Sequence, residues 1–179
     1  VSCRAPGKPV VLKSPPHLGR VEALAERFPG ARFVHIIRHP YSVFPSTQRL
    51  WRSLDLVQGL QSPKHEGLDE YVYSCLESMY SAFQRQRPGL PAGSICDVLY
   101  EDLVADPLEE VLRIYEQLDL GEIEPARRNL EKYVDSQRDF KGNRHQLEES
   151  DRREVNRRWG EFFESYGYDL EGAATGRPD

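Results

Sequence analysis

The chain has 179 residues, the length of a single domain, and 39% of them are hydrophobic. This is enough for one packed core, and glycine and proline are close to average, so global disorder and collagen-like or low-complexity sequence are excluded. The formal net charge is −5, and no apolar run approaches the roughly 18 residues that predict a membrane span.

Two short apolar runs near the start, residues 9–13 and 32–37, predict buried strands. Between them, residues 18–28 repeat apolar side chains at spacings of three and four, which predicts a helix. Ser14 is placed to cap this helix and Pro15 takes its first position. Strand, helix and strand in this order predict a βαβ unit, and therefore a parallel sheet.

The middle of the chain predicts two further helices. One follows Pro40 and continues to about residue 54, with a kink expected at Pro45 because proline removes a backbone hydrogen bond. Residues 56–67 are expected to form an exposed loop. The apolar spacing over residues 68–83 then predicts a long amphipathic helix, which the following Pro-Gly pair ends.

The second half predicts one more strand and three more helices. Asp106 is a helix cap, because proline follows it directly and glutamate stands three residues after it. We expect one α/β domain over residues 1–170, followed by a disordered tail over 171–179. The predicted elements are a strand at 95–100 and helices at 107–118, at 125–136 and from about 150.

Charge is unevenly distributed along the sequence. Residues 31–65 contain five basic residues and one acidic residue, so this segment carries +4 and the remainder −9. A basic island in an acidic chain indicates a local anion site rather than a broad nucleic-acid surface. The basic residues are Arg32, Arg38, Arg49, Arg52 and Lys64.

The cysteines Cys3, Cys75 and Cys96 are odd in number and contain no C-x-x-C pair. Neither a disulfide scaffold nor a zinc site is expected, which favours a reducing compartment and a cytoplasmic protein. No secretory signal opens the sequence. The chain starts at a valine and its one methionine is Met79, so we expect a piece of a longer protein.

Candidate functional residues gather in the first third of the chain. Lys13 ends the first predicted strand, His17 lies in the first turn of the next helix, and Arg38 ends the second strand. Ligands of open α/β sheets bind at the carboxyl ends of the strands, so we expect these three residues to meet at one rim. Helix N-termini there favour anions, Arg38 has the fork geometry that suits phosphate, and Ser46 adds a hydroxyl.

These residues resemble a known family. The sequence KSPPH at residues 13–17, followed by FPGARFVHIIRHPYSVFPS at residues 28–46, is similar to the PAPS-dependent sulfotransferases, especially their bacterial branch. In that family, an arginine at a strand end and a serine eight residues later hold the 3′-phosphate of PAPS. The resemblance assigns these roles to Arg38 and Ser46.

Three later segments carry the same resemblance. LYEDL at residues 99–103 is similar to a family segment whose tyrosine lies near the adenine, which corresponds to Tyr100. FKGNRH at residues 140–145 resembles the basic loop that closes over the 3′-phosphate, and implies that Lys141, Gly142 and Arg144 bind the donor. RRWGEFFESYGY at residues 157–168 resembles the last helix of the bacterial branch.

The resemblance implies a three-layer sandwich like that of P-loop NTPases, with a central parallel sheet flanked by helices. One departure stands out. The family opens with a strand and a Gly-, Ser- and Thr-rich loop that cradles the 5′-phosphosulfate, and the chain contains neither G-x-x-x-x-G-K-[ST] nor a similar stretch. We therefore expect the first strand and phosphate loop to be missing from this sequence, which leaves its own activity open.

The resemblance also implies a mechanism. A sulfuryl group moves from PAPS to an acceptor hydroxyl or amine without a metal, His17 acts as general base, and Lys13 stabilises charge on the transferred group. Glu101 and Asp102 are alternative bases, although a Y-E-D sequence after a strand more often serves structure. Residues 51–67 and the helix over 68–83 are expected to flank the acceptor, with Tyr71, Tyr73, Met79 and Tyr80 as possible lining residues.

Two other functions remain open from the sequence. A P-loop kinase-like phosphotransferase shares the architecture, but the Walker lysine and the magnesium-binding aspartate that it needs are not visible. A sulfotransferase-like fragment that only binds nucleotide or a partner is the second alternative. The acceptor can be a small molecule, a carbohydrate or a lipid, no nucleic-acid partner or transmembrane segment is expected, and the oligomeric state is not predicted.

Overall fold

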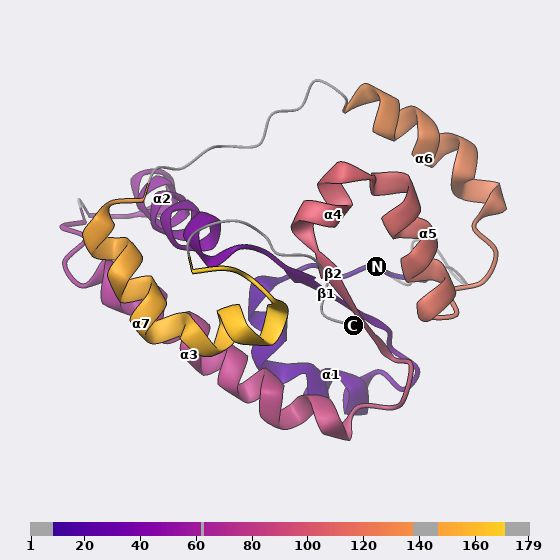
Figure 1. Ribbon diagram of the computed structural model, residues 1–179, viewed down its shortest axis with the longest axis horizontal. Helices are drawn as coiled ribbons and strands as arrows, with labels where there is room; N and C mark the ends of the chain where they lie inside the picture. Colours follow the sequence, from indigo (N-terminus) through magenta and orange to yellow (C-terminus); the bar gives the residue numbers. More distant parts are fainter. Residues whose placement is uncertain (1–8, 62, 138–146, 171–179) are drawn as a thin grey trace.

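The computed structural model describes residues 9–61, 63–137 and 147–170 (Figure 1). Within these residues, helices surround a small parallel sheet. The elements, in chain order, are the 3₁₀ helix η1 (Pro15–Arg20), α1 (Val21–Arg27), β1 (Phe33–Ile37), α2 (Pro40–Gln58), α3 (Leu68–Gln86), the 3₁₀ turn η2 (Arg87–Gly89), β2 (Ile95–Leu99), α4 (Tyr100–Ala105), α5 (Pro107–Gln117), α6 (Glu124–Ser136) and α7 (Glu149–Tyr166).

The two strands pair in parallel, in a register that runs from Phe33 opposite Ile95 to Ile37 opposite Leu99. Helices α2 and α3 form the crossover between them, which a parallel pair requires because a tight turn cannot connect the two strands. The predicted α/β class, with a parallel sheet and helices, is confirmed. Both strands end at the same edge of the sheet, where α2 and α4 begin.

The two faces of the sheet are covered to different extents. Ile37 lies on the face that packs with Phe83 of α3 and Phe163 of α7, in the larger of the two hydrophobic cores. On the opposite face, β2 packs against residues of the α5 region, including buried Leu118. There the β1 side chains Val34 and Ile36 are 43% and 55% exposed, so the second face is covered over β2 and open over β1.

A polar cluster fixes the register on the face toward α3. His35 and Asp97 are partners in the strand pairing, and their side chains are joined by a 2.9 Å contact between Nδ1 and Oδ1. Arg87 donates to the other oxygen of Asp97 at 2.6 Å. Burial disfavours the charged form of Asp97, but these two partners outweigh burial and lower the pKa of the carboxyl.

The predicted strand at residues 9–13 is wrong, because this segment has no strand pairing in the structure. Its apolar side chains are not buried either, and Val11 is 92% exposed. A strand needs a partner for its backbone groups, and a short apolar run does not by itself supply one. Lys13 is therefore not at a strand end, and the parallel pair is made by β1 and β2 instead of the predicted βαβ unit.

Most helix predictions are confirmed, with shifted ends. Ser14 precedes η1 and Pro15 begins it, but the Ser14 side chain makes no capping hydrogen bond. The helix after Pro40 continues through Pro45 to Gln58, beyond the predicted end. Asp106 caps α5 as expected, since its carboxylate accepts the Glu109 N–H at 3.1 Å. The predicted tail over residues 171–179 lies outside the described residues.

Candidate functional site at the strand ends

The site begins where the two paired strands end. Arg38 and Tyr100 each follow a member of the last pair in the register, Ile37 and Leu99. The Arg38 guanidinium carbon lies 4.2 Å from the centre of the Tyr100 ring. This is a cation–π contact, in which the charge of the guanidinium is attracted to the face of the aromatic ring.

Arg38 has a buried side-chain donor that no described residue uses. Within the described part of the chain it makes no hydrogen bond or ion pair, and its Nε is buried without a partner. Other arginines are engaged by the protein itself: Arg87 by Asp97, Arg113 by Glu110 and Arg158 by Glu70 and Glu77. The donors of Arg38 are therefore available to an anionic ligand.

Helix α2 starts directly beside Arg38. His39 is its N-cap, and His39 Nδ1 accepts the Tyr41 N–H at 3.2 Å. Burial lowers the pKa of His39, which keeps the ring neutral and able to accept this hydrogen bond. The positive end of the helix dipole thus adds to the charge of Arg38 at the same edge of the sheet.

Ser46 lies on α2, six residues beyond its first residue, Pro40. At a rise of about 1.5 Å per residue, this is about 9 Å along the helix axis. The Ser46 side chain is partly exposed and makes no hydrogen bond to a described residue. Arg38 and Ser46 are thus connected by the start of α2, and each has polar groups that have no partner among the described residues.

Glu101, which the sequence offered as an alternative base, and Tyr168, which the sequence did not assign to the site, complete this edge. The Glu101 carboxylate accepts the His39 N–H at 3.2 Å and the Tyr168 hydroxyl at 2.7 Å. Tyr168 is 6% exposed, and burial together with Glu101 raises the pKa of its hydroxyl. Both oxygens of Glu101 are occupied, which favours a structural role for this carboxylate over its use as a base.

Neither of the two proposed catalytic residues belongs to a strand or directly follows one in the structure. Lys13 is exposed in an irregular segment, and His17 lies in η1, which packs against α3. His17 Nδ1 is buried and has no hydrogen-bond partner among the described residues. No hydrogen bond or ion pair of the described chain joins either residue to Arg38 or Tyr100.

The remaining donor-binding candidates, Lys141, Gly142 and Arg144, lie outside the described residues. Of the proposed acceptor-lining residues, Tyr73 belongs to the core, where its ring stacks on Phe44 with centroids 4.4 Å apart. Tyr71 is half-exposed and meets Trp51 edge-on at 5.5 Å.

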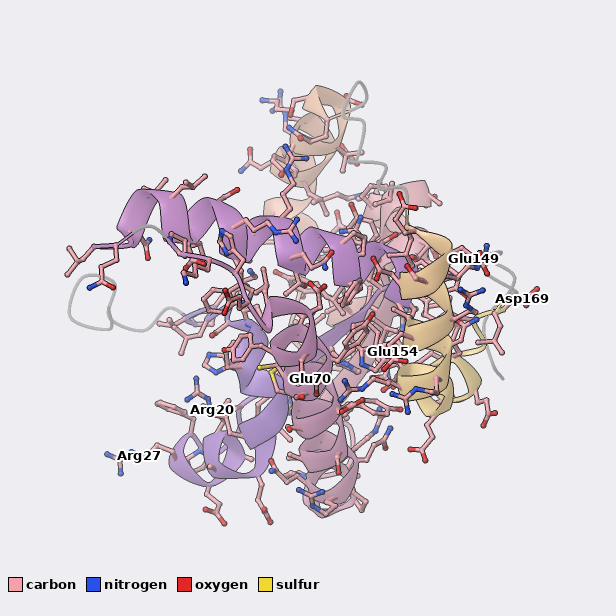
Figure 2. All side chains as sticks on the ribbon, turned by 90° about the vertical axis from the view of Figure 1, so that its left-hand side faces the viewer. Arg20, Arg27, Glu70, Glu149, Glu154 and Asp169 are labelled. Carbon is pink, nitrogen blue, oxygen red and sulfur yellow. The ribbon has the colours of Figure 1, made fainter. Side chains whose placement is uncertain are left out.

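A groove of about 410 Å³ lies between α3 and α7. Its lining includes Tyr80, Trp159 and Phe162, but none of Arg38, Ser46 and Tyr100. Arg158 of α7 joins the two helices through ion pairs with Glu70 and Glu77 of α3. Figure 2 labels Glu70 on α3 and Glu154 on α7. The groove is separate from the strand-end site.

Two features are absent from the described residues, 9–61, 63–137 and 147–170. In these ranges, no three or more histidine, cysteine, aspartate or glutamate side chains come together in a way that could hold a metal ion. None of the helices in the same ranges combines the length and apolar character needed to cross a bilayer.

Known proteins provide an independent comparison. Two curated relatives, from Mycobacterium bovis (strain ATCC BAA-935 / AF2122/97) and Mycobacterium tuberculosis (strain CDC 1551 / Oshkosh), are both named omega-hydroxy-beta-dihydromenaquinone-9 sulfotransferase Stf3. Each is 39% identical over 162 residues, which are 90% of this chain and 42% of the relative. The chain thus spans less than half the length of these relatives.

Solved structures share the fold. The sulfotransferase STF9 from Mycobacterium avium matches with a TM-score of 0.72 at 21% identity, over 90% of this chain and 43% of that one. The sulfotransferase domain from the curacin biosynthetic pathway matches with a TM-score of 0.50 at 16% identity, over 87% and 64% of the two chains. The model of the sulfotransferase family matches residues 1–125. The resemblance noted in the sequence is confirmed, and the chain belongs to the sulfotransferase family.

Proposed function

We propose that the protein containing this chain transfers a sulfuryl group from PAPS to an acceptor hydroxyl or amine, and that this chain recognises the 3′-phosphate of the donor. The observation that carries the proposal is Arg38, which stands at a strand end, stacks on Tyr100 and has no polar partner among the described residues. An arginine whose donors are unused by the fold suits a phosphate group, which accepts two parallel hydrogen bonds from the guanidinium.

Each nearby residue has a role in this proposal. Arg38 contributes the fork and the charge, and the Ser46 hydroxyl donates one more hydrogen bond to the 3′-phosphate. Tyr100 packs near the adenine while it orients Arg38. In this proposal, Lys141, Gly142 and Arg144 also bind the 3′-phosphate, and only the sequence resemblance supports their role.

The transfer itself needs a base and charge stabilisation. A bond forms between the acceptor oxygen and sulfur, while the bond from sulfur to the 5′-phosphate oxygen breaks, and the acceptor proton moves to His17 in this proposal. Lys13 stabilises charge on the transferred group or the leaving oxygen. The buried Nδ1 of His17, which has no hydrogen-bond partner in the described chain, is consistent with a ring reserved for a ligand.

The acceptor is proposed as a small molecule, a carbohydrate or a lipid. The curated relatives are named for a hydroxylated menaquinone, so a hydroxylated isoprenoid quinone is the first acceptor to test. Trp51 and half-exposed Tyr71 meet between α2 and α3 and provide an aromatic surface for such a molecule.

We further propose that the 5′-phosphosulfate contacts residues outside this sequence. The chain contains no glycine-rich phosphate loop and spans 42% of its curated relatives. The finer fold description, a P-loop-like three-layer sandwich whose first strand and loop are missing here, belongs to the same proposal. Family membership favours sulfuryl transfer over phosphoryl transfer.

Calorimetry of the full-length protein tests the proposal. We expect tighter binding of 3′,5′-ADP than of 5′-AMP, because only the former carries the 3′-phosphate. Sulfate transfer from radiolabelled PAPS to a hydroxylated isoprenoid quinone tests the reaction, with ATP as the control donor for the kinase alternative. Equal affinity for the two nucleotides would overturn the phosphate site, and a preference without transfer to any acceptor class would support a binding module.

A further inference from the structure

The Glu101 carboxylate joins three segments that are distant in sequence. Glu101 is the second residue of α4, and its two oxygens accept hydrogen bonds from His39, 62 residues earlier, and from Tyr168, 67 residues later. Each bond uses a different oxygen: Oε1 accepts the His39 N–H, and Oε2 accepts the Tyr168 hydroxyl. One side chain therefore connects the end of β1, the start of α4 and the segment after α7.

The first of these bonds acts directly on Arg38. The His39 N–H belongs to the planar peptide group that joins Arg38 to His39. Fixing this N–H restrains the backbone of Arg38 at the point from which its side chain extends to Tyr100. Because Tyr100 is the residue next to Glu101, the same carboxylate restrains both partners of the 4.2 Å stack.

The second bond supports the carboxylate from the opposite side. Tyr168 is buried, and its ring lies 4.9 Å from the His39 ring and parallel to Phe162 at 6.5 Å. Its hydroxyl can reach Glu101 only because the chain bends back after α7, where Gly167 adopts a left-handed conformation (φ 66°). Tyr168 thereby limits the positions available to the Glu101 carboxylate.

We propose that Glu101 and Tyr168 are positioning residues that hold Arg38 and Tyr100 in the arrangement required for 3′-phosphate recognition. The inference rests on the proposed function, because its main readout is the preference for 3′,5′-ADP over 5′-AMP. Neither residue needs to touch the nucleotide, since both act through the peptide group between Arg38 and His39 and through the start of α4.

The main test compares variants that differ by few atoms in the full-length protein. Tyr168→Phe removes one hydroxyl, and we expect about a tenfold loss of affinity for 3′,5′-ADP with less than a threefold change for 5′-AMP. Glu101→Ala should lose more affinity for 3′,5′-ADP than Tyr168→Phe does. Glu101→Gln should recover part of the loss, because its amide oxygen can still accept from His39 while its amide NH₂ donates to the Tyr168 oxygen.

Matched controls and a second measurement separate this inference from the proposed function. Glu164→Gln removes an exposed carboxylate of α7, and Tyr133→Phe removes an exposed hydroxyl of α6, so neither should alter nucleotide preference. Amide hydrogen exchange at the start of α2 should accelerate in Glu101→Ala and not in the controls. This exchange measurement tests, without any nucleotide, whether Glu101 restrains the backbone at the start of α2.

The outcomes are distinct. If the unaltered protein shows no preference for 3′,5′-ADP over 5′-AMP, the proposed function fails. Amide hydrogen exchange alone then decides whether Glu101 restrains the backbone at the strand ends. If the preference exists but Tyr168→Phe and Glu101→Gln retain it fully, and exchange is unchanged in Glu101→Ala, the positioning role is wrong. Should Glu101→Ala fail to fold, Tyr168→Phe and Glu101→Gln still decide the question.

Discussion

Arg38→Ala tests the proposed site at its central residue. A hydrogen bond to a charged group contributes roughly 1.5–3 kcal/mol, so loss of the guanidinium should weaken 3′,5′-ADP binding by about one to two decades. Truncating an arginine often also breaks an internal ion pair. Arg38 has no such partner among the described residues, and only the Tyr100 stack is lost, which contributes about 0.5–2 kcal/mol.

The measurement is calorimetric titration of the full-length protein with 3′,5′-ADP and 5′-AMP, together with urea unfolding. Affinity for 5′-AMP should change little, because this nucleotide lacks the 3′-phosphate. Arg38→Lys keeps the charge but not the fork and should give an intermediate loss. Arg127→Ala is the matched control, because this arginine of α6 pairs only with Glu124 and Glu131 in the described structure.

Two results would refute the reasoning. If Arg38→Ala weakens 3′,5′-ADP and 5′-AMP equally, Arg38 does not read the 3′-phosphate. If the free energy of unfolding falls by more than about 3 kcal/mol, Arg38 supports the fold through contacts other than the Tyr100 stack. A double-mutant cycle of Arg38→Ala with Tyr100→Leu then measures how much of the binding loss depends on the stack.

Three further outcomes are expected. His17→Ala should lower kcat by about 10²–10⁴ in the full-length enzyme with unchanged 3′,5′-ADP affinity, and turnover within twofold of the unaltered enzyme contradicts its role as base. Because the pKa of His39 is below 6.5 in the folded chain, the unfolded chain binds more protons as pH falls through 6.5, so stability is complete above this pH and declines below it. His39→Asn, which retains a capping oxygen, should flatten this decline in urea unfolding at pH 7.5 and 5.5, and an unchanged decline rules the assignment out. Asp106→Ala should cost about 1 kcal/mol of unfolding free energy while Asp106→Asn costs little, and equal losses would mean that the cap contributes nothing.

Local sequence patterns predicted local structure well. The Asp106 cap and the helix after it depend on residues close in sequence, and the structure confirms them. The strand predicted at residues 95–100 is observed over Ile95–Leu99. Residues 9–13 had the same apolar character as β1 but form no strand. A strand needs a neighbouring strand to pair with, and the sequence of a segment does not show whether such a neighbour is present.

The candidate site was only partly predictable for the same reason. Arg38 was identified because it follows an apolar run, and Tyr100 because its segment resembles the family. The bond between Tyr168 and Glu101 carries no such signal, since it joins residues 67 positions apart through a turn after α7. The sequence shows that Gly167 and Tyr168 follow the predicted final helix, but nothing in it indicates that Tyr168 is buried or that Glu101 is its partner.

The long crossover between β1 and β2 has a consequence for how the chain folds. Phe33 and Ile95 pair across 62 residues, and closing a loop of this length costs about 3.7 kcal/mol plus a constant in chain entropy. Such distant contacts slow folding, whereas α2 and α3 can form from local contacts beforehand. Arg38 and Tyr100 therefore come together only when the strands pair. A nucleotide that binds both residues selects the fully assembled chain over partly folded forms, so it should protect the whole domain against unfolding.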